Sequence, residues 1–323
     1  MLLSATGALP LCENLRMEQI HSDVFMIDTM LGGRPGITGA YVFTGDQPAI
    51  VDTGAETSAD AVDAELAKAG IGPDDLAWIV LTHVHLDHCG AAGVLAERYP
   101  KATVVTHRRG APHLVEPDRL VAGTEEIYGP FFSLYGGLQP IHEDRVVAAE
   151  DGHEVPIGPG RSLKLLDTPG HAPHHSVVLD EGTGTLIAGD AVGSRLAGSG
   201  LFPAYPPPRV DIAAIRASLA RISSLGIETL CLAHIGAVDD LEADLARSDE
   251  QAQIYADAGM AAAQGGAEHA DMAFALEEAL PLSSNVGDEQ AAVLWRVLGW
   301  ERNNAMGVLG WARHEMKKAA EQA

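Results

Sequence analysis

The densest group of potential metal ligands in this sequence lies at residues 82–88, which read THVHLDH. His83, His85, Asp87 and His88 follow LAWIVL, a nearly all-apolar run that is typical of a buried strand. Because alternate residues of a strand face the same side, His83 and His85 point together, and a turn brings Asp87 and His88 round to them. Imidazole and carboxylate suit Zn²⁺, Fe²⁺ or Mn²⁺, so the segment predicts a metal site.

Three more side chains of ligand type follow apolar strands farther along the chain. His171 lies in a tight loop after LKLLD, Asp190 follows TLIAG, and His234 follows LCLA. Each lies at the C-terminal end of a predicted strand, where side chains can meet above a sheet. A structural zinc site needs only four ligands, whereas these seven groups suffice for two metal ions. The pattern therefore predicts a two-metal site.

The segments around these side chains predict strands interleaved with helices and hairpins. Strands are expected at 23–29, 36–45, 47–54, 76–83, 102–107, 161–170, 176–182, 184–191 and 228–234. Helices are expected at 56–70, 89–98 and about 211–224, with one or two more in 110–145, a segment that we expect to shape a pocket. The order indicates an α/β fold that is not a plain βαβ repeat.

The character of the sequence changes after Gly236, because no strand pattern appears from Asp239 onward. Apolar residues recur at helical spacing in this part, at Leu294, Leu298, Ala305 and Leu309. It also holds three of the four tryptophans, Trp295, Trp300 and Trp311. We expect these rings to pack the C-terminal part onto the core; the alternatives are the substrate entrance and a homodimer interface. The predicted organisation is a tail at 1–19, a main domain at 20–240 and a helical extension at 241–323.

The amino-acid composition limits the classes of molecule that this protein is expected to bind. The formal net charge is −24, from 45 acidic and 21 basic residues, which disfavours nucleic acid. The basic cluster His107-Arg108-Arg109 is too small to change this. Three cysteines indicate a reducing compartment, and we expect a cytoplasmic protein without an export signal or a membrane span. The expected partner is a small-molecule substrate.

Taken together, these motifs resemble those of the metallo-β-lactamase-fold hydrolase superfamily over about residues 20–240. The matching pieces are VDTG (51–54), THVHLDH (82–88), TPGHAP (168–173), LIAGDAV (186–192) and LCLAHIG (230–236). The resemblance implies a four-layer αββα sandwich with the site at one edge, here followed by a C-terminal helical extension.

The resemblance also implies how the ligands divide between two divalent ions, Zn²⁺ first, with Fe or Mn as alternatives. His83, His85 and His171 would hold one ion, and Asp87, His88 and His234 the other. Asp190 would bridge them, and Asp52 would fix a ligand histidine by a hydrogen bond. The implied reaction is hydrolysis of an ester, lactone or thioester by a hydroxide held between the ions, with Asp87 and Asp190 as catalytic residues.

Other branches of the superfamily fit less well. True β-lactamases lack the bridging aspartate, and glyoxalase II-type thioesterases carry basic C-terminal residues that we do not recognise here. Acyl-homoserine-lactone lactonases carry a Tyr three residues past that aspartate, where this chain has Gly193. Tyr205 either takes the place of that tyrosine or packs the loop in which it lies. A phosphodiesterase conflicts with the charge. The alternative in another reaction class is a persulfide dioxygenase with one iron.

Several nearby side chains leave two interpretations open. His174 and His175 either touch substrate or hold the loop, and Arg108 and Arg109 either neutralise a substrate carboxylate or lie in solvent. Cys89 is expected to be a small buried residue at a helix start.

Overall fold

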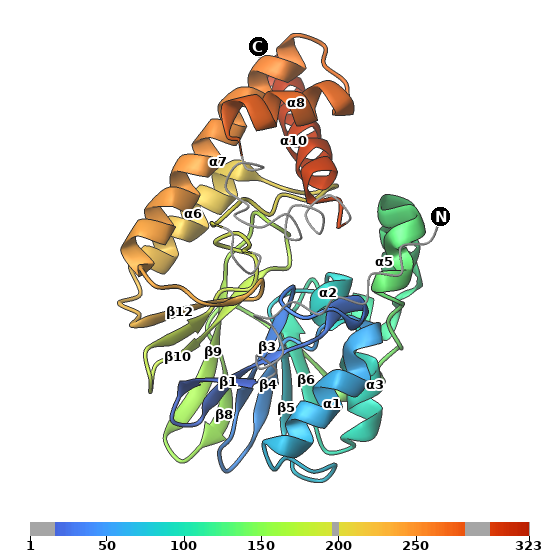
Figure 1. Cartoon of the computed structure of the whole chain (residues 1–323), viewed down its shortest axis with the longest axis vertical. Helices are drawn as coiled ribbons and strands as arrows, with labels where there is room; N and C mark the ends of the chain where they lie inside the picture. The colour runs from blue at the N-terminus through green and yellow to red at the C-terminus, as the bar shows by residue number, and fades with distance from the viewer. Residues whose placement is uncertain (1–16, 196–199, 282–297, 323) are drawn as a thin grey trace.

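The computed structural model describes residues 17–195, 200–281 and 298–322, and two β-sheets lie at its centre (Figure 1). The first sheet has the order β1-β2-β3-β4-β5-β6-β7, and the second has the order β13-β12-β11-β10-β9-β8. The strands of the first sheet are Met17–His21, Val24–Asp28, Gly39–Phe43, Ala49–Val51, Trp78–Leu81, Thr103–His107 and Val146–Ala149. Those of the second, from β8 to β13, are His153–Gly158, Arg161–Asp167, Ser176–Asp180, Thr185–Ile187, Thr229–Leu232 and Gly236–Ala237.

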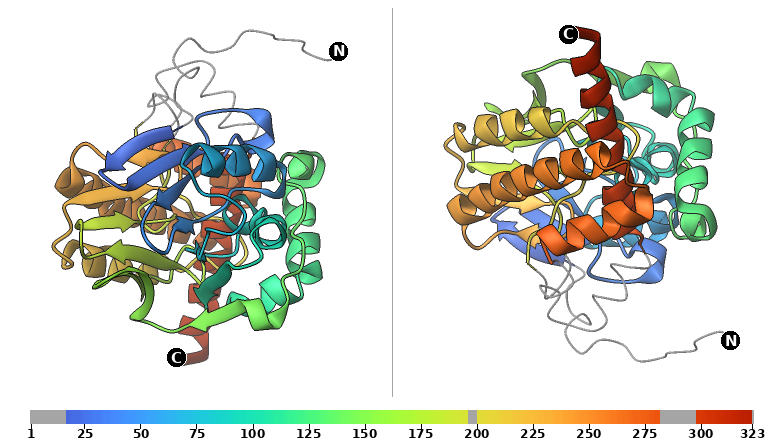
Figure 2. Two further views of the ribbon diagram at one scale, coloured as in Figure 1. Left: turned by 90° about the horizontal axis from the view of Figure 1, so that it is seen from below. Right: turned by 90° about the horizontal axis from the view of Figure 1, so that it is seen from above.

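Helices cover the outer faces of both sheets (Figures 1 and 2). Those that accompany the first sheet are α1 Ala59–Lys68, α2 Leu86–Cys89, α3 Ala92–Arg98, α4 Ala111–Val115 and α5 Asp118–Tyr128, with short 3-10 turns at Leu31–Gly33, Glu56–Ser58, Gly129–Leu134 and Glu143–Arg145. Those beside the second sheet are α6 Ile212–Ser223, α7 Leu241–Gln264, α8 His269–Ala279 and α10 Trp300–Gln322. Seen from above in Figure 2, α10 lies across the end of α7 and beside α8.

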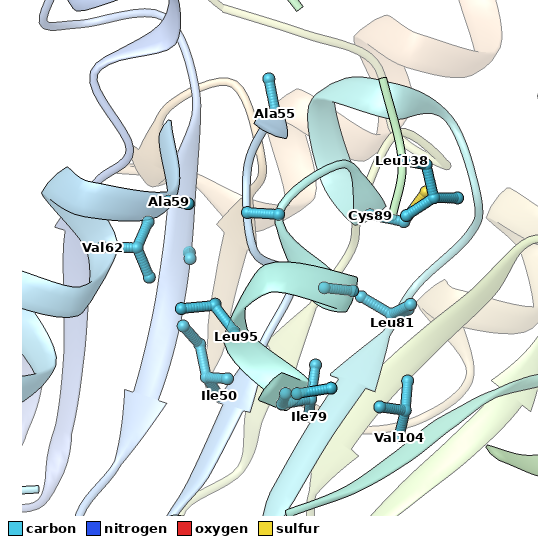
Figure 3. Packing of buried hydrophobic residues seen from close by; sticks show 14 of the residues in the cluster. Ile50, Ala55, Ala59, Val62, Ile79, Leu81, Cys89, Leu95, Val104 and Leu138 are labelled. Carbon is cyan, nitrogen blue, oxygen red and sulfur yellow. The ribbon is translucent and has the colours of Figure 1, made fainter. Parts of the chain in front are cut away.

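Three apolar cores separate four layers. One core lies between α1 and α3 and the first sheet, and includes Ile50, Val62, Ile79 and Leu95 (Figure 3). A second lies between the two sheets, and a third lies between the second sheet and α6, α7 and α10. The predicted αββα sandwich with C-terminal helices is therefore confirmed.

The central position of strand β5 explains why its sequence is almost entirely apolar. Ile79 and Leu81 face the helices and Val80 faces the second sheet, so both faces of the strand are covered. Each of these side chains is fully buried, which contributes about 1.5–3 kcal/mol per residue to folding. The strand is thus a rigid base for the histidines that follow it.

Strand direction brings the predicted ligands to one edge. β4 and β5 are parallel neighbours in the first sheet, and β11 and β12 are parallel neighbours in the second. Their carboxyl ends lead into Asp52, His83, Asp190 and His234. The polar side chains follow the ends of the strands, as the sequence predicts.

The structure also differs from the prediction in places. β1 begins at Met17, inside the segment expected to be a tail, and the sequence pattern did not indicate β7, β8 or β13. The helix expected at 89–98 is two helices, α2 and α3, with Gly90 between them. Because a Cβ on Gly90 would lie 2.6 Å from the amide nitrogen of Glu56, this close approach admits only glycine.

The C-terminal part packs on the core, as expected for Trp300 and Trp311. Leu298 belongs to the core of the first sheet, whereas Leu309 belongs to the core of the second. Leu294 and Trp295 lie outside the described residues. None of the helices in the described ranges combines the length and hydropathy needed to cross a bilayer.

Candidate metal centre

All seven predicted ligands converge at one edge of the two sheets, near the carboxyl ends of strands from both. They form overlapping groups whose potential ligand atoms lie within 4.8 Å of one another: His83 with His85 and His171, His83 with His88 and Asp190, and Asp87 with His88 and His234. His83 and His85 lie between β5 and α2, Asp87 and His88 lie in α2, and His171, Asp190 and His234 lie in the loops that follow β9, β11 and β12. The structure therefore gathers every residue of the set into one small volume.

The first group consists of three imidazoles. Nδ1 of His85 lies 3.0 Å from Nε2 of His83 and 2.9 Å from Nε2 of His171. The rings of His83 and His85 are nearly perpendicular, with centroids 4.5 Å apart. Three nitrogen atoms thus point at a common position, which is an arrangement suited to three ligands of one ion.

The second group lies beside the first, and Asp190 lies between them. Oδ2 of Asp87 is 3.5 Å from Nε2 of His234 and 3.9 Å from Nε2 of His88. Oδ1 of Asp190 lies 3.5 Å from Nε2 of His88 and 3.6 Å from Nε2 of His234. Its other oxygen, Oδ2, lies 3.4 Å from Nε2 of His171 in the first group. One carboxylate therefore faces both groups.

The outward nitrogens of the histidines are held by fixed acceptors. Nδ1 of His171 donates to the carbonyl of Ala204 at 2.6 Å, and Nδ1 of His234 donates to the carbonyl of Ile37 at 2.9 Å. Because a neutral imidazole carries one proton, these bonds assign the lone pair of each ring to Nε2. Both lone pairs then point into the cluster.

Asp52 organises His88 and His83 together. Its Oδ2 accepts from Nδ1 of His88 at 2.9 Å, and its carboxylate accepts from the amide and hydroxyl of Thr82. Since the Thr82 hydroxyl donates to Asp52, its oxygen is left to accept from Nδ1 of His83 at 3.1 Å. The Asp52 backbone is left-handed, with φ of 60°, a conformation that aspartate tolerates better than most residues.

Burial and mutual repulsion keep most of these imidazoles neutral. Burial, followed by the neighbouring imidazoles, holds the pKa of His83 and His85 well below the usual value, and burial also lowers the pKa of His171. Burial alone would lower the pKa of His88, but the carboxylates of Asp190 and Asp87 raise it well above the usual value. Neutral imidazole is the form that binds metal.

Asp190 stays ionised for a related reason. Burial would raise the pKa of its carboxyl, yet the surrounding His88, His234 and His171 hold it well below the usual range. Its Oδ1 and the Nε2 atom of His88 are nonetheless buried without a hydrogen-bond partner among the described residues. Buried polar atoms without partners are costly, and a bound cation would satisfy both at once. The residues present therefore fit a metal ion.

The residues with two open interpretations are mostly structural. Nε2 of His175 accepts from the amide of Asp190 at 3.0 Å, and its Nδ1 donates to Thr168 at 2.9 Å, so His175 holds the loop. The Tyr205 ring packs against Tyr255 with centroids 5.7 Å apart, which supports the packing role. Cys89 is fully buried at the end of α2, as expected.

His174 differs from its neighbour. Its ring stacks near His83 with centroids 6.2 Å apart, and its Nδ1 is buried without a hydrogen-bond partner in the part of the chain that the structure describes. Burial, with the charges of nearby histidines, lowers the pKa of His174 to about 3. Arg109 donates to the carbonyl of Pro173 at 3.4 Å, so that arginine has a partner beside the same loop.

Apart from Asp52, sequence reasoning missed the groups that orient the proposed ligands. Thr82 precedes His83 directly but carries no signal of its own, and the carbonyls of Ile37 and Ala204 have no side-chain signature. For Trp300 the sequence left packing, the substrate entrance and a dimer interface open; its ring packs on the core and also lies edge-on to His234, with centroids 5.5 Å apart. The spacing of the sequence could not reveal these contacts, because they join segments far apart in the chain.

We expect Asp52→Asn to weaken metal binding by about 10–100-fold, the range typical of groups that orient metal ligands. An amide NH₂ in place of Oδ2 cannot accept from His88, so the ring would move its proton to Nε2 and lose the inward lone pair. Chelator competition on the purified variant measures the change. Asp180→Asn is the control, because Asp180 is equally buried but pairs with Arg161. Equal affinities in the two variants would contradict the role of Asp52.

The fold and this cluster define a member of the metallo-beta-lactamase superfamily, and the chain belongs to it: the family model matches residues 33–234. Members of this superfamily are mostly metal-dependent hydrolases that bind divalent metals, and the clusters described above are compatible with such ions.

Among individual relatives, the metallo-beta-lactamase fold-containing protein ST1585 of Sulfurisphaera tokodaii is 32% identical over 235 residues, which are 70% of this chain and 84% of that protein. The crystal structure of ST1585 from Sulfolobus tokodaii matches 67% of this chain and 80% of that chain, with a TM-score of 0.58. TTHA1429 from Thermus thermophilus shares the fold at 22% identity and a TM-score of 0.62, over 88% of this chain and 89% of that chain.

A shorter match joins this chain to the N-acyl homoserine lactonase AttM of Azorhizobium caulinodans. The two are 34% identical over 116 residues, which are 36% of this chain and 40% of the lactonase.

Proposed function

We propose that this chain is a hydrolase of a small-molecule ester, lactone or thioester that uses two divalent metal ions, most suitably Zn²⁺, with Fe or Mn as alternatives. The observation that carries the proposal is the position of Asp190, whose two oxygens face different groups of imidazoles. In this assignment His83, His85 and His171 hold one ion, and Asp87, His88 and His234 hold the other. When bound, such ions act as Lewis acids and lower the pKa of coordinated water toward neutrality.

The side chains supply the conditions for that chemistry. His83, His85 and His171 are neutral because burial lowers their pKa, so they present lone pairs at neutral pH. Asp190 stays ionised and brings negative charge to balance two cations. Asp52 and the carbonyls of Ala204 and Ile37 fix the ring orientations, so the centre needs little reorganisation during turnover.

Two alternatives rest on the same fold. A persulfide dioxygenase would use one iron held by two histidines and an aspartate, and would leave part of the present set without a role. A phosphodiesterase would bind an anionic substrate against a net charge of −24. The partial likeness to proteins named as lactonases supports a lactone within the ester class. We further propose a cytoplasmic location and a homodimer.

Metal analysis followed by a substrate panel tests the proposal. We expect about two equivalents of metal per chain, and chelator-reversible turnover of at least one lactone, ester or thioester. The panel includes an acyl homoserine lactone, acyl thioesters and phosphodiesters, with oxygen uptake on a persulfide measured in parallel. One iron per chain with oxygen consumption would replace this proposal by the dioxygenase.

A further inference from the structure

Helix α10 lies outside the residues that match the family model, yet its backbone rests on a loop of the metal centre. Gly307 faces the loop residue Tyr205, and a Cβ at Gly307 would lie 2.0 Å from the Tyr205 carbonyl oxygen. Only glycine allows so close an approach. The C-terminal helix and the loop that follows β11 are therefore in direct backbone contact.

Asn304, one turn earlier in α10, holds this loop from both sides. Its Oδ1 accepts from the amide of Tyr205 at 2.7 Å, and its Nδ2 donates to the carbonyl of Pro203 at 2.8 Å. The side chain is 3% exposed, so both bonds are shielded from water. A carboxamide offers one acceptor and one donor in a plane, which matches the two backbone groups.

The residue between these two anchor points touches a proposed ligand. The carbonyl of Ala204 accepts the proton on Nδ1 of His171 at 2.6 Å. Any shift of Pro203 or Tyr205 would move this carbonyl, and with it the ring that presents Nε2 to His83 and His85.

We propose that Asn304 is a positioning residue of the metal centre, which fixes the Ala204 carbonyl and through it the orientation of His171. The inference rests on the proposed function, since it requires His171 to be a metal ligand. It gives the C-terminal extension a role in metal binding: the loss of the Asn304 carboxamide weakens one of the two metal positions and leaves the other, made by Asp87, His88 and His234, largely intact.

The chain offers a matched control at the next position. Asn303 is also in α10 and is 2% exposed, but neither polar atom of its side chain has a hydrogen-bond partner among the residues that the structure describes. Substitution of Asn303 therefore changes the packing of the same helix without touching the loop at 203–205.

The test is titration of cobalt(II) into chelator-stripped wild type, Asn304→Ala, Asn304→Asp and Asn303→Ala, each checked for folding by circular dichroism. Visible absorption reports the coordination of each cobalt ion, and competition with a chromophoric chelator gives its affinity. We expect both Asn304 variants to bind one of two equivalents about tenfold more weakly, with an altered spectrum, and Asn303→Ala to match wild type. Wild-type binding in a folded Asn304 variant, or an equal loss in Asn303→Ala, would overturn the inference.

A measurement on the wild type covers the case in which the variants do not fold. Because coupling is reciprocal, metal binding should slow hydrogen exchange of the Tyr205 amide more than that of the Ala214 amide, which Asp211 caps at the start of α6. Equal protection of the two amides would overturn the inference. Failure of the wild type to bind cobalt would instead refute the proposed function.

Discussion

Asp190→Asn is expected to lower turnover at least about a thousandfold, equal to about 4 kcal/mol of transition-state stabilisation, and to leave one tightly bound metal equivalent in place of two. Oδ1 of Asp190 lies within 3.6 Å of His88 and His234, whereas Oδ2 lies 3.4 Å from His171. An amide keeps the volume of the side chain but removes one acceptor and the negative charge. The two halves of the centre would then lack their shared ligand.

The experiment compares metal content, turnover and folding of Asp190→Asn with those of Asp180→Asn. Asp180 is fully buried and ion-paired with Arg161, so its substitution lowers stability without touching the cluster. We expect the control to keep both metal equivalents and most of its turnover when folded. Turnover of Asp190→Asn within about tenfold of wild type, with two equivalents bound, would contradict the bridging role.

The gathering of the side chains could be predicted because most of them lie at or just after strand ends, whereas the four-layer fold was implied by the resemblance of the motifs to the superfamily. His83, His171 and His234 each follow an apolar run, and apolar runs of that length become buried strands. Once β4 and β5, and likewise β11 and β12, pair in parallel, their carboxyl ends meet at one edge. Local sequence therefore indicated that these residues follow strands. That His171, which follows the antiparallel strand β9, joins the others was implied only by the resemblance.

Contacts made by backbone groups were beyond prediction. The carbonyls of Ile37 and Ala204 orient His234 and His171, but every residue has a carbonyl and no side-chain pattern marks these two. Asn304 lies more than a hundred residues from His171 in the sequence, and only the packing of α10 on the loop joins them. Such contacts depend on the relative placement of whole elements.

The missed strands have a different explanation. β1, MEQIH, pairs only with β2 at the edge of the first sheet, and its exposed side chains give it no apolar face. β7, VVAA, is short and follows a long segment without clear periodicity. In both cases the pairing strand, not the local pattern, determines the structure.

The metal-free protein is expected to unfold on mild acidification, and bound metal is expected to prevent this. Burial, first of all, lowers the pKa of five imidazoles of the cluster and its loop, which are those of His83, His85, His171, His174 and His175. These rings take up protons less readily in the folded chain than in the unfolded chain, where protonation begins below a pH of about 6.5. The unfolded state then binds more protons, so stability falls as the pH falls.

Two other groups do not reverse this trend. The pKa of His88 is raised, so its contribution is fully present below a pH of about 6.5 and is lost only as the pH rises through its folded pKa. The pKa of Asp190 is lowered, so its contribution is lost only in much stronger acid. Between a pH of about 6.5 and 5, the five neutral imidazoles therefore dominate the slope.

Each imidazole that stays neutral in the folded chain removes up to about 1.4 kcal/mol of stability per pH unit, and five together remove at most about 7 kcal/mol per pH unit. A domain has only about 5–15 kcal/mol to lose, so we expect the chelator-treated protein to unfold near a pH of 5–6. Bound metal favours the neutral ligands and should move this transition to lower pH. Urea unfolding followed by circular dichroism, with and without zinc, measures both curves. His174→Leu is the control for the slope of the unfolding free energy against pH, since it removes one titrating ring that is not a proposed ligand. A metal-free protein that is equally stable at about pH 7 and 5.5 would show that these imidazoles do not control its acid stability.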